Sequence, residues 1–173
     1  IAERGFLPGI WLAPFIATRK SLLYREHRGW FIKNHRGKPL LASLNPMWEG
    51  LAYYALDITH PEVKDYLKKV FRLIKEWGYR YVKIDFLFAS LLKGTRHDDR
   101  ATGVDAYREG LKIIRETLGE DVCILGCGGP FLPSLGLVDV MRIGTDVAPY
   151  WRSRTQRIAI GSPVEPSCEN SIR

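Results

Sequence analysis

Cysteine, methionine and long apolar runs are all scarce in this chain of 173 residues. It has three cysteines and two methionines, and no stretch approaches the roughly 20 apolar residues that a membrane span requires. Because three is odd, at least one cysteine stays unpaired within the chain. Cys123 and Cys127 lie on one face of a predicted strand, about 13 Å apart along it, which is too far for a disulfide. We therefore expect a cytoplasmic protein from a reducing compartment, with no membrane partner.

Several motif classes are also missing. Ligand spacings of the Cys-x-x-Cys or His-x-x-x-His kind, which are typical of zinc sites, do not occur. The glycine cluster at 126–129 lacks the Lys-Ser/Thr of a P-loop, so a tight turn explains it better. The four histidines lie in predicted loops or at a helix start, without a Ser or Cys elbow, and so give little support to a hydrolase triad. We expect no metal and no cofactor.

Charge does not point to nucleic acid. The net charge of +7 is compatible with an anionic partner. The basic residues are spread through predicted helices and loops, however, and a solvated surface explains that distribution better. A nucleic-acid partner is therefore not expected.

The length of the chain limits which folds it can complete by itself. The chain begins at Ile1, without an initiator methionine, and soon enters an apolar run. A complete barrel of eight βα units needs roughly 250 residues, and the strands predicted here suffice for only part of one. We expect one incomplete domain over residues 1–173, an internal piece of a longer protein, with a poorly matched polar tail at 152–173.

Predicted strands alternate with predicted helices. The apolar run 9–16, with Pro14 near its end, is typical of a strand buried on both faces, and 17–50 is expected to have little regular structure. Further strands are predicted at 53–58, 79–88, 121–127 and 137–143, and a helix at 104–118. Alternation of this kind indicates an α/β fold with a parallel sheet.

One helix has clear start and stop residues. Thr59, followed by Pro61 and Glu62, predicts a capping box with proline in the first turn. Apolar residues then recur at spacings of three and four, and Gly78 is expected to end the helix.

Asp85 is a candidate catalytic carboxylate. Alternate side chains of the strand 79–88 point to opposite faces. The apolar row is expected to pack against helices; it consists of Val82, Ile84, Phe86 and Phe88. Lys83 and Asp85 then point together into the barrel, where buried charges are costly unless paired or solvated at a site mouth. Asp85 lies toward the carboxyl end of the strand, where barrel enzymes build their sites. A purely structural Lys83–Asp85 pair is an equal alternative.

The segment 141–146 also places a carboxylate at the end of a predicted strand. In extended geometry Arg142, Gly144 and Asp146 share a face, and the glycine leaves room for a ligand between guanidinium and carboxylate. Retaining glycosidases use two carboxylates about 5 Å apart, one to attack the sugar and one to protonate the departing oxygen. Asp85 and Asp146 are the candidates for these roles, although an ion pair explains the second segment about as well.

Other polar and aromatic residues have simpler explanations. Trp11 and Trp48 offer apolar ring faces on which a sugar could stack, but core packing is the more common role of a tryptophan in an apolar strand. The remaining acids are expected to be structural; they include Asp57, Asp105, Glu109 and Asp139.

Five sequence blocks occur in the order seen in α-galactosidases of glycoside hydrolase family 36. They are Gly9-Ile-Trp-Leu-Ala-Pro-Phe, Tyr54-Ala-Leu-Asp-Ile-Thr, Gly78-Tyr-Arg-Tyr-Val-Lys-Ile-Asp-Phe-Leu-Phe-Ala, Ile124-Leu-Gly-Cys-Gly-Gly-Pro and Met141-Arg-Ile-Gly-Thr-Asp-Val-Ala-Pro-Tyr-Trp. The chain resembles that family from about residue 7 to residue 151. Five ordered blocks are much more specific than any one of them.

The resemblance implies a (β/α)8 catalytic barrel that hydrolyses terminal α-galactosides with retention and without metal. By resemblance, Asp85 matches the nucleophile and Asp146 the acid/base. The matching substrate-binding positions are Lys83, Arg142, Trp11 and Cys127. The family's N-terminal β-sandwich, its early acidic pair and its last barrel units have no counterpart here, so we expect the chain alone to be inactive.

Two other functions stay open at this point. A related barrel glycosidase could act on another α-linked sugar, because the acid pair sets the reaction type while the missing loops set the sugar. A non-catalytic sugar-binding remnant is the second alternative, and the presence of both Asp85 and Asp146 weighs against it.

Overall fold

The computed structural model describes residues 1–44, 51–144, 146, 147 and 151. The chain divides into two compact units, Ile1–Met141 and Arg142–Arg173. The elements described here belong to the first unit, apart from the last residue of its final strand.

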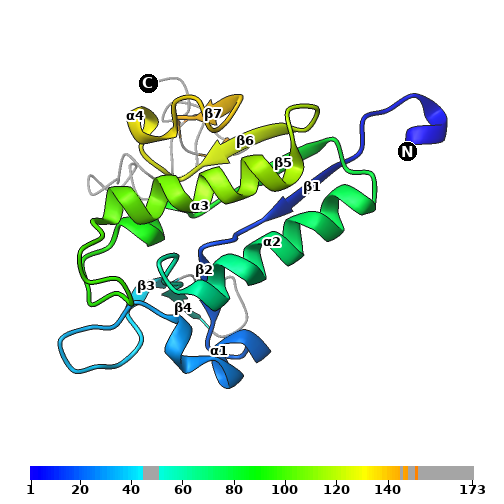
Figure 1. Ribbon diagram of the computed structural model, residues 1–173. Coiled ribbons are helices and arrows are strands. Elements are labelled where there is room, and N and C mark those ends of the chain that lie inside the picture. The colour runs from blue at the N-terminus through cyan, green and yellow to red at the C-terminus, as the bar shows by residue number, and fades with distance from the viewer. Residues whose placement is uncertain (45–50, 145, 148–150, 152–173) are drawn as a thin grey trace. The chain divides into compact units, whose positions relative to one another are not determined.

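A parallel sheet forms the centre of the first unit (Figure 1). Its strands are β1 (Gly9–Leu12), β5 (Tyr81–Ile84), β6 (Cys123–Cys127) and β7 (Val140–Arg142), and they lie in that order. β5 pairs in parallel with β1 on one side and with β6 on the other. The register places Trp11, Lys83 and Leu125 at one level of the sheet. The side chains of three neighbouring strands are thereby aligned just before the strands end.

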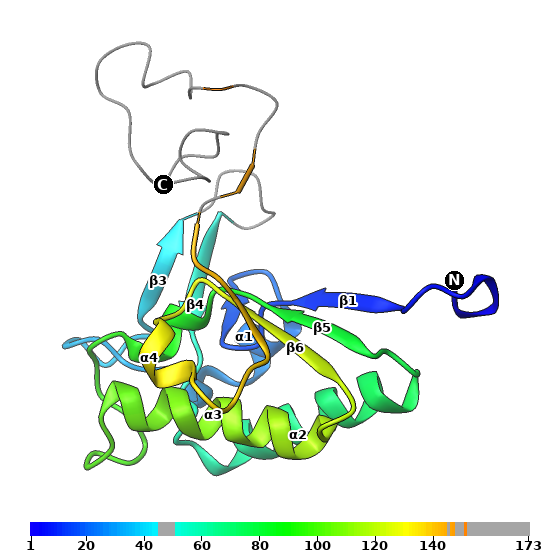
Figure 2. The same cartoon turned by 90° about the horizontal axis from the view of Figure 1, so that it is seen from above.

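Two amphipathic helices lie side by side on one face of this sheet (Figures 1 and 2). They are α2 (Pro61–Glu76) and α3 (Gly103–Leu118). α2 buries Val63, Leu67, Phe71 and Ile74, the stripe that the sequence predicts. Both helices are confirmed, and each is followed by a glycine with positive φ, Gly78 and Gly119. This left-handed conformation is accessible to glycine at little cost.

The predicted cap of α2 is wrong. His60, and not Thr59, precedes the helix as its N-cap, and its ring nitrogen accepts a hydrogen bond from the Glu62 backbone N–H. The Thr59 hydroxyl instead donates to the Asp57 carboxylate. Because the Asp57 carboxylate engages the Thr59 hydroxyl, the cap is provided by the next residue, His60.

A second sheet is antiparallel and has the order β2-β4-β3. It consists of β2 (Ile16–Thr18), β4 (Ala52–Ala55) and β3 (Leu41–Leu44), with the short helix α1 (Leu22–Glu26) between β2 and β3. Three predictions are corrected here. The run 9–16 is two strands of different sheets, and 17–50 contains β2, α1 and β3. The strand predicted at 53–58 is β4, which is antiparallel.

Pro14 explains the first of these corrections. β1 ends at Leu12 and β2 begins at Ile16. Proline cannot donate to a ladder and commonly marks a strand end. β1 is also only half-buried, with alternating exposed and partly buried residues, so it is not the doubly buried strand that its apolar sequence predicts.

The α/β class with a parallel sheet is confirmed. The core of the first unit lies between the parallel sheet and its helices and continues beneath the second sheet; its largest fully buried side chains include Tyr107, Phe15, Phe31 and Phe71. The short helix α4 (Phe131–Ser134) follows β6, where the sequence predicts at most a short helix. Among the described residues, no helix is long and apolar enough to cross a membrane.

Candidate active site

Asp85 lies immediately after the carboxyl end of the central strand β5. Its backbone N–H still donates to the Leu12 carbonyl at 2.9 Å, so the ladder with β1 extends one residue past β5. The next residue, Phe86, has a φ of 54°, in the left-handed region. A phenylalanine in that conformation is uncommon and costs about 1–3 kcal/mol. Strained backbone of this kind clusters at functional sites.

The turn at Phe86 corrects the predicted alternation. Val82 and Ile84 are buried, as expected for the helix-facing row. Phe86 was predicted to continue that row, but its ring meets Trp11 edge-on at 6.5 Å and Tyr53 at 5.3 Å. Trp11 is at the level of Lys83 in the sheet. The left-handed residue thus moves the Phe86 ring to the side of the sheet that holds Asp85.

The Asp85 carboxylate receives hydrogen bonds on both oxygens. The Trp11 indole N–H donates to Oδ2 at 3.1 Å, and the Phe86 backbone N–H donates to Oδ1 at 2.8 Å. The Lys83 ammonium lies 3.9 Å from Oδ2. Cys127, at the end of β6, contributes a further side-chain hydrogen bond. Four candidates from the sequence, Trp11, Lys83, Asp85 and Cys127, are therefore gathered at one point.

These donors lower the pKa of Asp85. Burial by itself raises the pKa of this carboxyl, whose side chain is only 13% exposed. The hydrogen bonds from Cys127, Phe86 and Trp11 and the charge of Lys83 outweigh burial, so the pKa is below its ordinary value. Hydrogen bonds to the charged form and a nearby cation both favour ionisation. Asp85 is thus held as a carboxylate at neutral pH.

Gly128 closes the site from the side of β6, and the sequence did not identify this role. Its φ is +61°, and a Cβ at this position would lie 3.3 Å from Asp85 Oδ1 and 3.3 Å from the Phe86 nitrogen. Its carbonyl accepts the Phe88 backbone N–H at 2.7 Å. The glycine cluster is indeed a tight turn, as predicted. The close approach of Asp85 and Phe86, which follow the neighbouring strand β5, explains why glycine is needed at residue 128.

Trp11 is not a core residue. Its side chain is exposed, at 46% of its full accessible surface, and its indole N–H is directed to Asp85. The expectation of core packing is therefore wrong for Trp11. Trp48 lies outside the described residues.

In the second unit, Arg142 and Asp146 contact each other directly. The guanidinium Nη1 donates to Asp146 Oδ1, and the Asp146 side chain is 65% exposed. The predicted opening for a ligand between the two groups is not present. The ion pair, the alternative that the sequence left open, is what the structure contains.

The other acids have structural roles, as predicted. Asp57 is 2% exposed and accepts hydrogen bonds from Thr59 and from the His97 backbone N–H. Asp139 accepts from the Arg115 guanidinium and from the Ile124 N–H at 2.7 Å. Both carboxylates therefore connect neighbouring segments of the chain.

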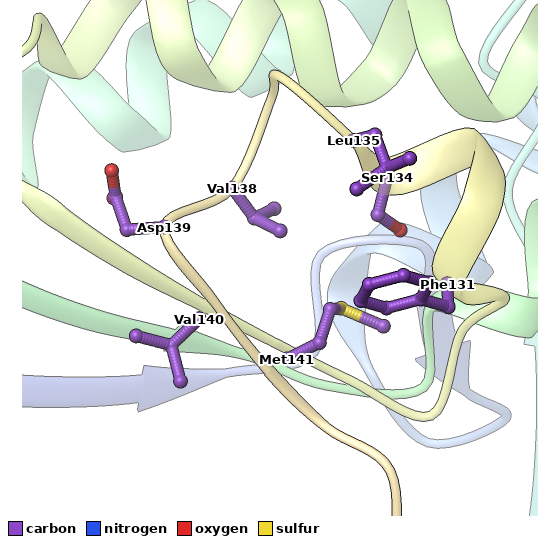
Figure 3. Close-up of a pocket in the computed structure, with 7 residues that line it drawn as sticks. All are labelled: Phe131, Ser134, Leu135, Val138, Asp139, Val140 and Met141. Atoms are coloured by element: carbon purple, nitrogen blue, oxygen red, sulfur yellow. The ribbon is translucent and has the colours of Figure 1, made fainter.

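An apolar pocket of about 200 Å³ lies beside α4 and is a different feature from the Asp85 site (Figure 3). Its only acidic side chain, Asp139, points away from the other lining side chains (Figure 3). That carboxylate is already engaged by Arg115. The pocket therefore lacks a free acid or base.

Within the described ranges, no group of three or more His, Cys, Asp or Glu side chains is arranged to hold a metal ion.

Solved structures similar to this chain are glycosidases. An α-galactosidase from Thermus thermophilus, in complex with stachyose, is 37% identical with a TM-score of 0.86, and the match covers 99% of this chain and 36% of that one. A family 36 α-galactosidase variant from Geobacillus stearothermophilus is 22% identical with a TM-score of 0.58, covering 81% of this chain and 20% of that one. A family 31 sulfoquinovosidase from E. rectale is 15% identical with a TM-score of 0.64, covering 84% and 23%. No family model matches the chain.

The fold of the chain is that of part of a (β/α)8 glycosidase barrel. Within that class it is a relative of the α-galactosidases of glycoside hydrolase family 36, and the resemblance of the five sequence blocks is confirmed. The chain spans about a third of the length of the Thermus thermophilus enzyme, 36% and 34% in two structures.

Proposed function

We propose that this chain supplies the central βα units of a retaining α-galactosidase, with Asp85 as the nucleophile and Asp146 as the acid/base. The observation that supports this most directly is the environment of Asp85. Its largely buried carboxylate sits at the carboxyl end of the central strand, with hydrogen-bond donors on both oxygens and Lys83 nearby. The Thermus thermophilus α-galactosidase has been solved in complex with stachyose and with p-nitrophenyl α-galactopyranoside, which supports α-galactosides as the substrate class.

In the first proposed step, an Asp85 oxygen attacks the anomeric carbon while Asp146 gives its proton to the glycosidic oxygen. The carbon–oxygen bond to the leaving group breaks, and an ester between Asp85 and the sugar forms. In the second step Asp146 takes a proton from water, and the water oxygen displaces Asp85. Two inversions give net retention.

The lowered pKa of Asp85 suits both steps. It keeps the group ionised for the attack. The same donors stabilise the carboxylate when it leaves the sugar in the second step, because a weaker base is a better leaving group. Trp11, Lys83 and Cys127 thus have a chemical role in this proposal as well as a binding role.

Arg142 is proposed to bind sugar hydroxyls with its guanidinium donors. Its direct contact with Asp146 leaves no space for a hydroxyl between the two groups. The proposal therefore requires Arg142 and Asp146 to separate when substrate binds. We further propose that residues 1–173 alone are inactive, because the match covers about a third of the relative.

The test uses the complete gene product that contains this chain. Asp85→Gly is expected to abolish hydrolysis of an aryl α-galactoside, and azide is expected to restore part of the turnover by attacking the anomeric carbon in place of the carboxylate. Asp99→Ala, in an exposed loop, is the matched control and should keep wild-type turnover. Turnover by Asp85→Gly without azide would refute the nucleophile role.

A panel of aryl α-glycosides separates the remaining alternatives. A clear preference for galactose supports the proposal. A preference for another α-linked sugar would assign the chain to a related glycosidase, and no turnover of any member by the complete protein would indicate a sugar-binding remnant.

A further inference from the structure

A cationic pocket of about 580 Å³ lies on the antiparallel sheet. Three basic side chains line it, from β2's end, from the segment after α1 and from the loop before β3: Arg19, Arg28 and Lys38. Tyr24 and Tyr54 also line it, together with Asn34, Pro39 and Leu41. No acidic side chain is among the lining residues. A volume of this size fits a small organic ligand.

The pocket is on the other face of the sheet from Asp85. Tyr53 and Tyr54 are consecutive residues of β4, so their side chains point to opposite faces. Tyr53 contacts Phe86, next to Asp85, whereas Tyr54 contacts Tyr24 in the pocket. The pocket is therefore separate from the proposed catalytic site, and its ligand does not depend on the proposed activity.

The base of the pocket is an ordered aromatic pair. Tyr24 is 4% exposed and its ring lies 4.5 Å from that of Tyr54. The Arg28 guanidinium carbon lies 4.0 Å from the centre of the Tyr24 ring, a cation–π arrangement that orients the guanidinium. A side-chain hydrogen bond also joins the two tyrosines. The contact with the Tyr24 ring therefore orients the Arg28 guanidinium at the pocket.

The positive charge in the pocket is not neutralised within the described part of the chain. Elsewhere, buried or half-buried cations pair with acids, as Lys64 does with Glu109 and Arg115 with Asp139. Arg19, Arg28 and Lys38 are exposed, and they take part in no such pair among residues 1–44 and 51–144. Three cations that line one pocket repel each other, and a bound anion would relieve that repulsion.

Asn34 adds a neutral donor. Its side-chain oxygen already accepts the backbone N–H groups of Arg36, at 2.9 Å, and Lys38, at 3.2 Å. The amide nitrogen is therefore the end left to interact with a ligand. Arginine forks and amide donors match the tetrahedral oxygens of a phosphate.

We propose that this pocket binds the phosphate group of a small phosphorylated sugar. Three cations suit a phosphate, which carries −1.5 to −2 charges at neutral pH, better than a single carboxylate. The half-buried Tyr54 ring offers a face for a sugar, because an aromatic face packs well on apolar C–H groups.

The test is calorimetric titration of the complete gene product with glucose 6-phosphate, inorganic phosphate and galacturonate. Glucose 6-phosphate is expected to bind saturably, with an affinity that falls as salt rises. Arg19→Gln with Arg28→Gln, and separately Lys38→Gln, should each weaken binding about tenfold or more, because each removes a charge-assisted hydrogen bond. Arg25→Gln, an exposed residue of α1 outside the pocket, is the matched control. Thermal melting shows whether each variant is folded.

Each outcome decides one point. Equal binding of inorganic phosphate and glucose 6-phosphate would support phosphate recognition and assign it to the free ion. Equal binding of galacturonate would overturn the preference for phosphate, and no saturable binding would overturn the site. If glucose 6-phosphate binding survives in the folded pocket variants but is lost in Asp85→Asn, the ligand occupies the Asp85 site and the proposal fails. Because Lys38 lies on an exposed loop away from the Tyr24 stack, its variant keeps the test valid if Arg28→Gln does not fold.

Discussion

Replacing Gly128 by alanine should impair Asp85 without removing or adding any charge. The added Cβ would lie 3.3 Å from Asp85 Oδ1 and from the Phe86 nitrogen, and 3.5 Å from the Phe86 Cα. Two of these atoms, Asp85 Oδ1 and the Phe86 nitrogen, form the hydrogen bond that holds Oδ1. The carboxylate must therefore shift by a few tenths of an ångström, and the Phe86 turn must shift with it.

The substitution has two effects, one on stability and one on the catalytic rate. Alanine at a φ of +61° costs about 1–2 kcal/mol of stability, whatever the surroundings. Displacement of the nucleophile is a separate effect on the rate. Since a misplacement of about 1 Å costs roughly 100-fold, we expect a loss of about two- to tenfold in kcat/KM from the smaller shift.

Gly136→Ala is the matched control. Gly136 has a similar φ of +77°, but a Cβ there would meet no atom within 4 Å. Both variants of the complete protein should lose similar stability in thermal or urea unfolding, and only Gly128→Ala should lose kcat/KM on an aryl α-galactoside. Equal kcat/KM for the two variants would refute the argument that Gly128 positions Asp85.

Two further predictions concern hydrogen bonds to carboxylates. Trp11→Phe removes a donor to ionised Asp85, so the pKa of Asp85 should rise and the acid limb of the kcat/KM profile should move to higher pH; Trp30→Phe, whose indole N–H donates to Glu62, should leave that limb in place. Asp139→Asn should lower the free energy of unfolding at pH 7 by about 1 kcal/mol, because it weakens the charge-assisted bond from Arg115. The pKa of Asp139 is lowered by hydrogen bonds from Ile124 and Arg115, which outweigh burial. Its stabilising effect is therefore present above the ordinary carboxyl pKa and is lost as the pH falls through the lower folded value, so urea titrations of the two proteins should converge in acid. A constant difference down to the most acidic pH would contradict this assignment.

The helices could be predicted because the residues that define a helix lie close together in the sequence. The apolar stripe of α2 and the glycine after it are within one stretch of sequence, and the structure has both. The same holds for α3. Spacings of three and four residues define a buried face without reference to any other element.

Strand partners were not predictable in the same way. Nothing in the run 9–16 alone indicates that Ile16 leaves the parallel sheet to pair with Ala55. Trp11 has apolar neighbours in sequence, yet its indole is exposed because the partner of its N–H is 74 residues away. Only a contact between distant segments distinguishes such a tryptophan from one in the core.

The candidate site was predicted in part. Alternation placed Lys83 and Asp85 on one face, which agrees with their 3.9 Å separation. It failed at Phe86, since phenylalanine favours strands and its left-handed φ depends on the surrounding packing. The catalytic pairing of Asp85 with Asp146 remains a prediction.

The parallel pairing of β1 with β5 also affects biosynthesis. Gly9 pairs with Tyr81, so β1 leaves the ribosome some 70 residues before its partner. At roughly 5–20 residues per second this gap lasts about 4–14 s. During that interval the apolar segment around Ile10 and Leu12 has no β5 to pair with.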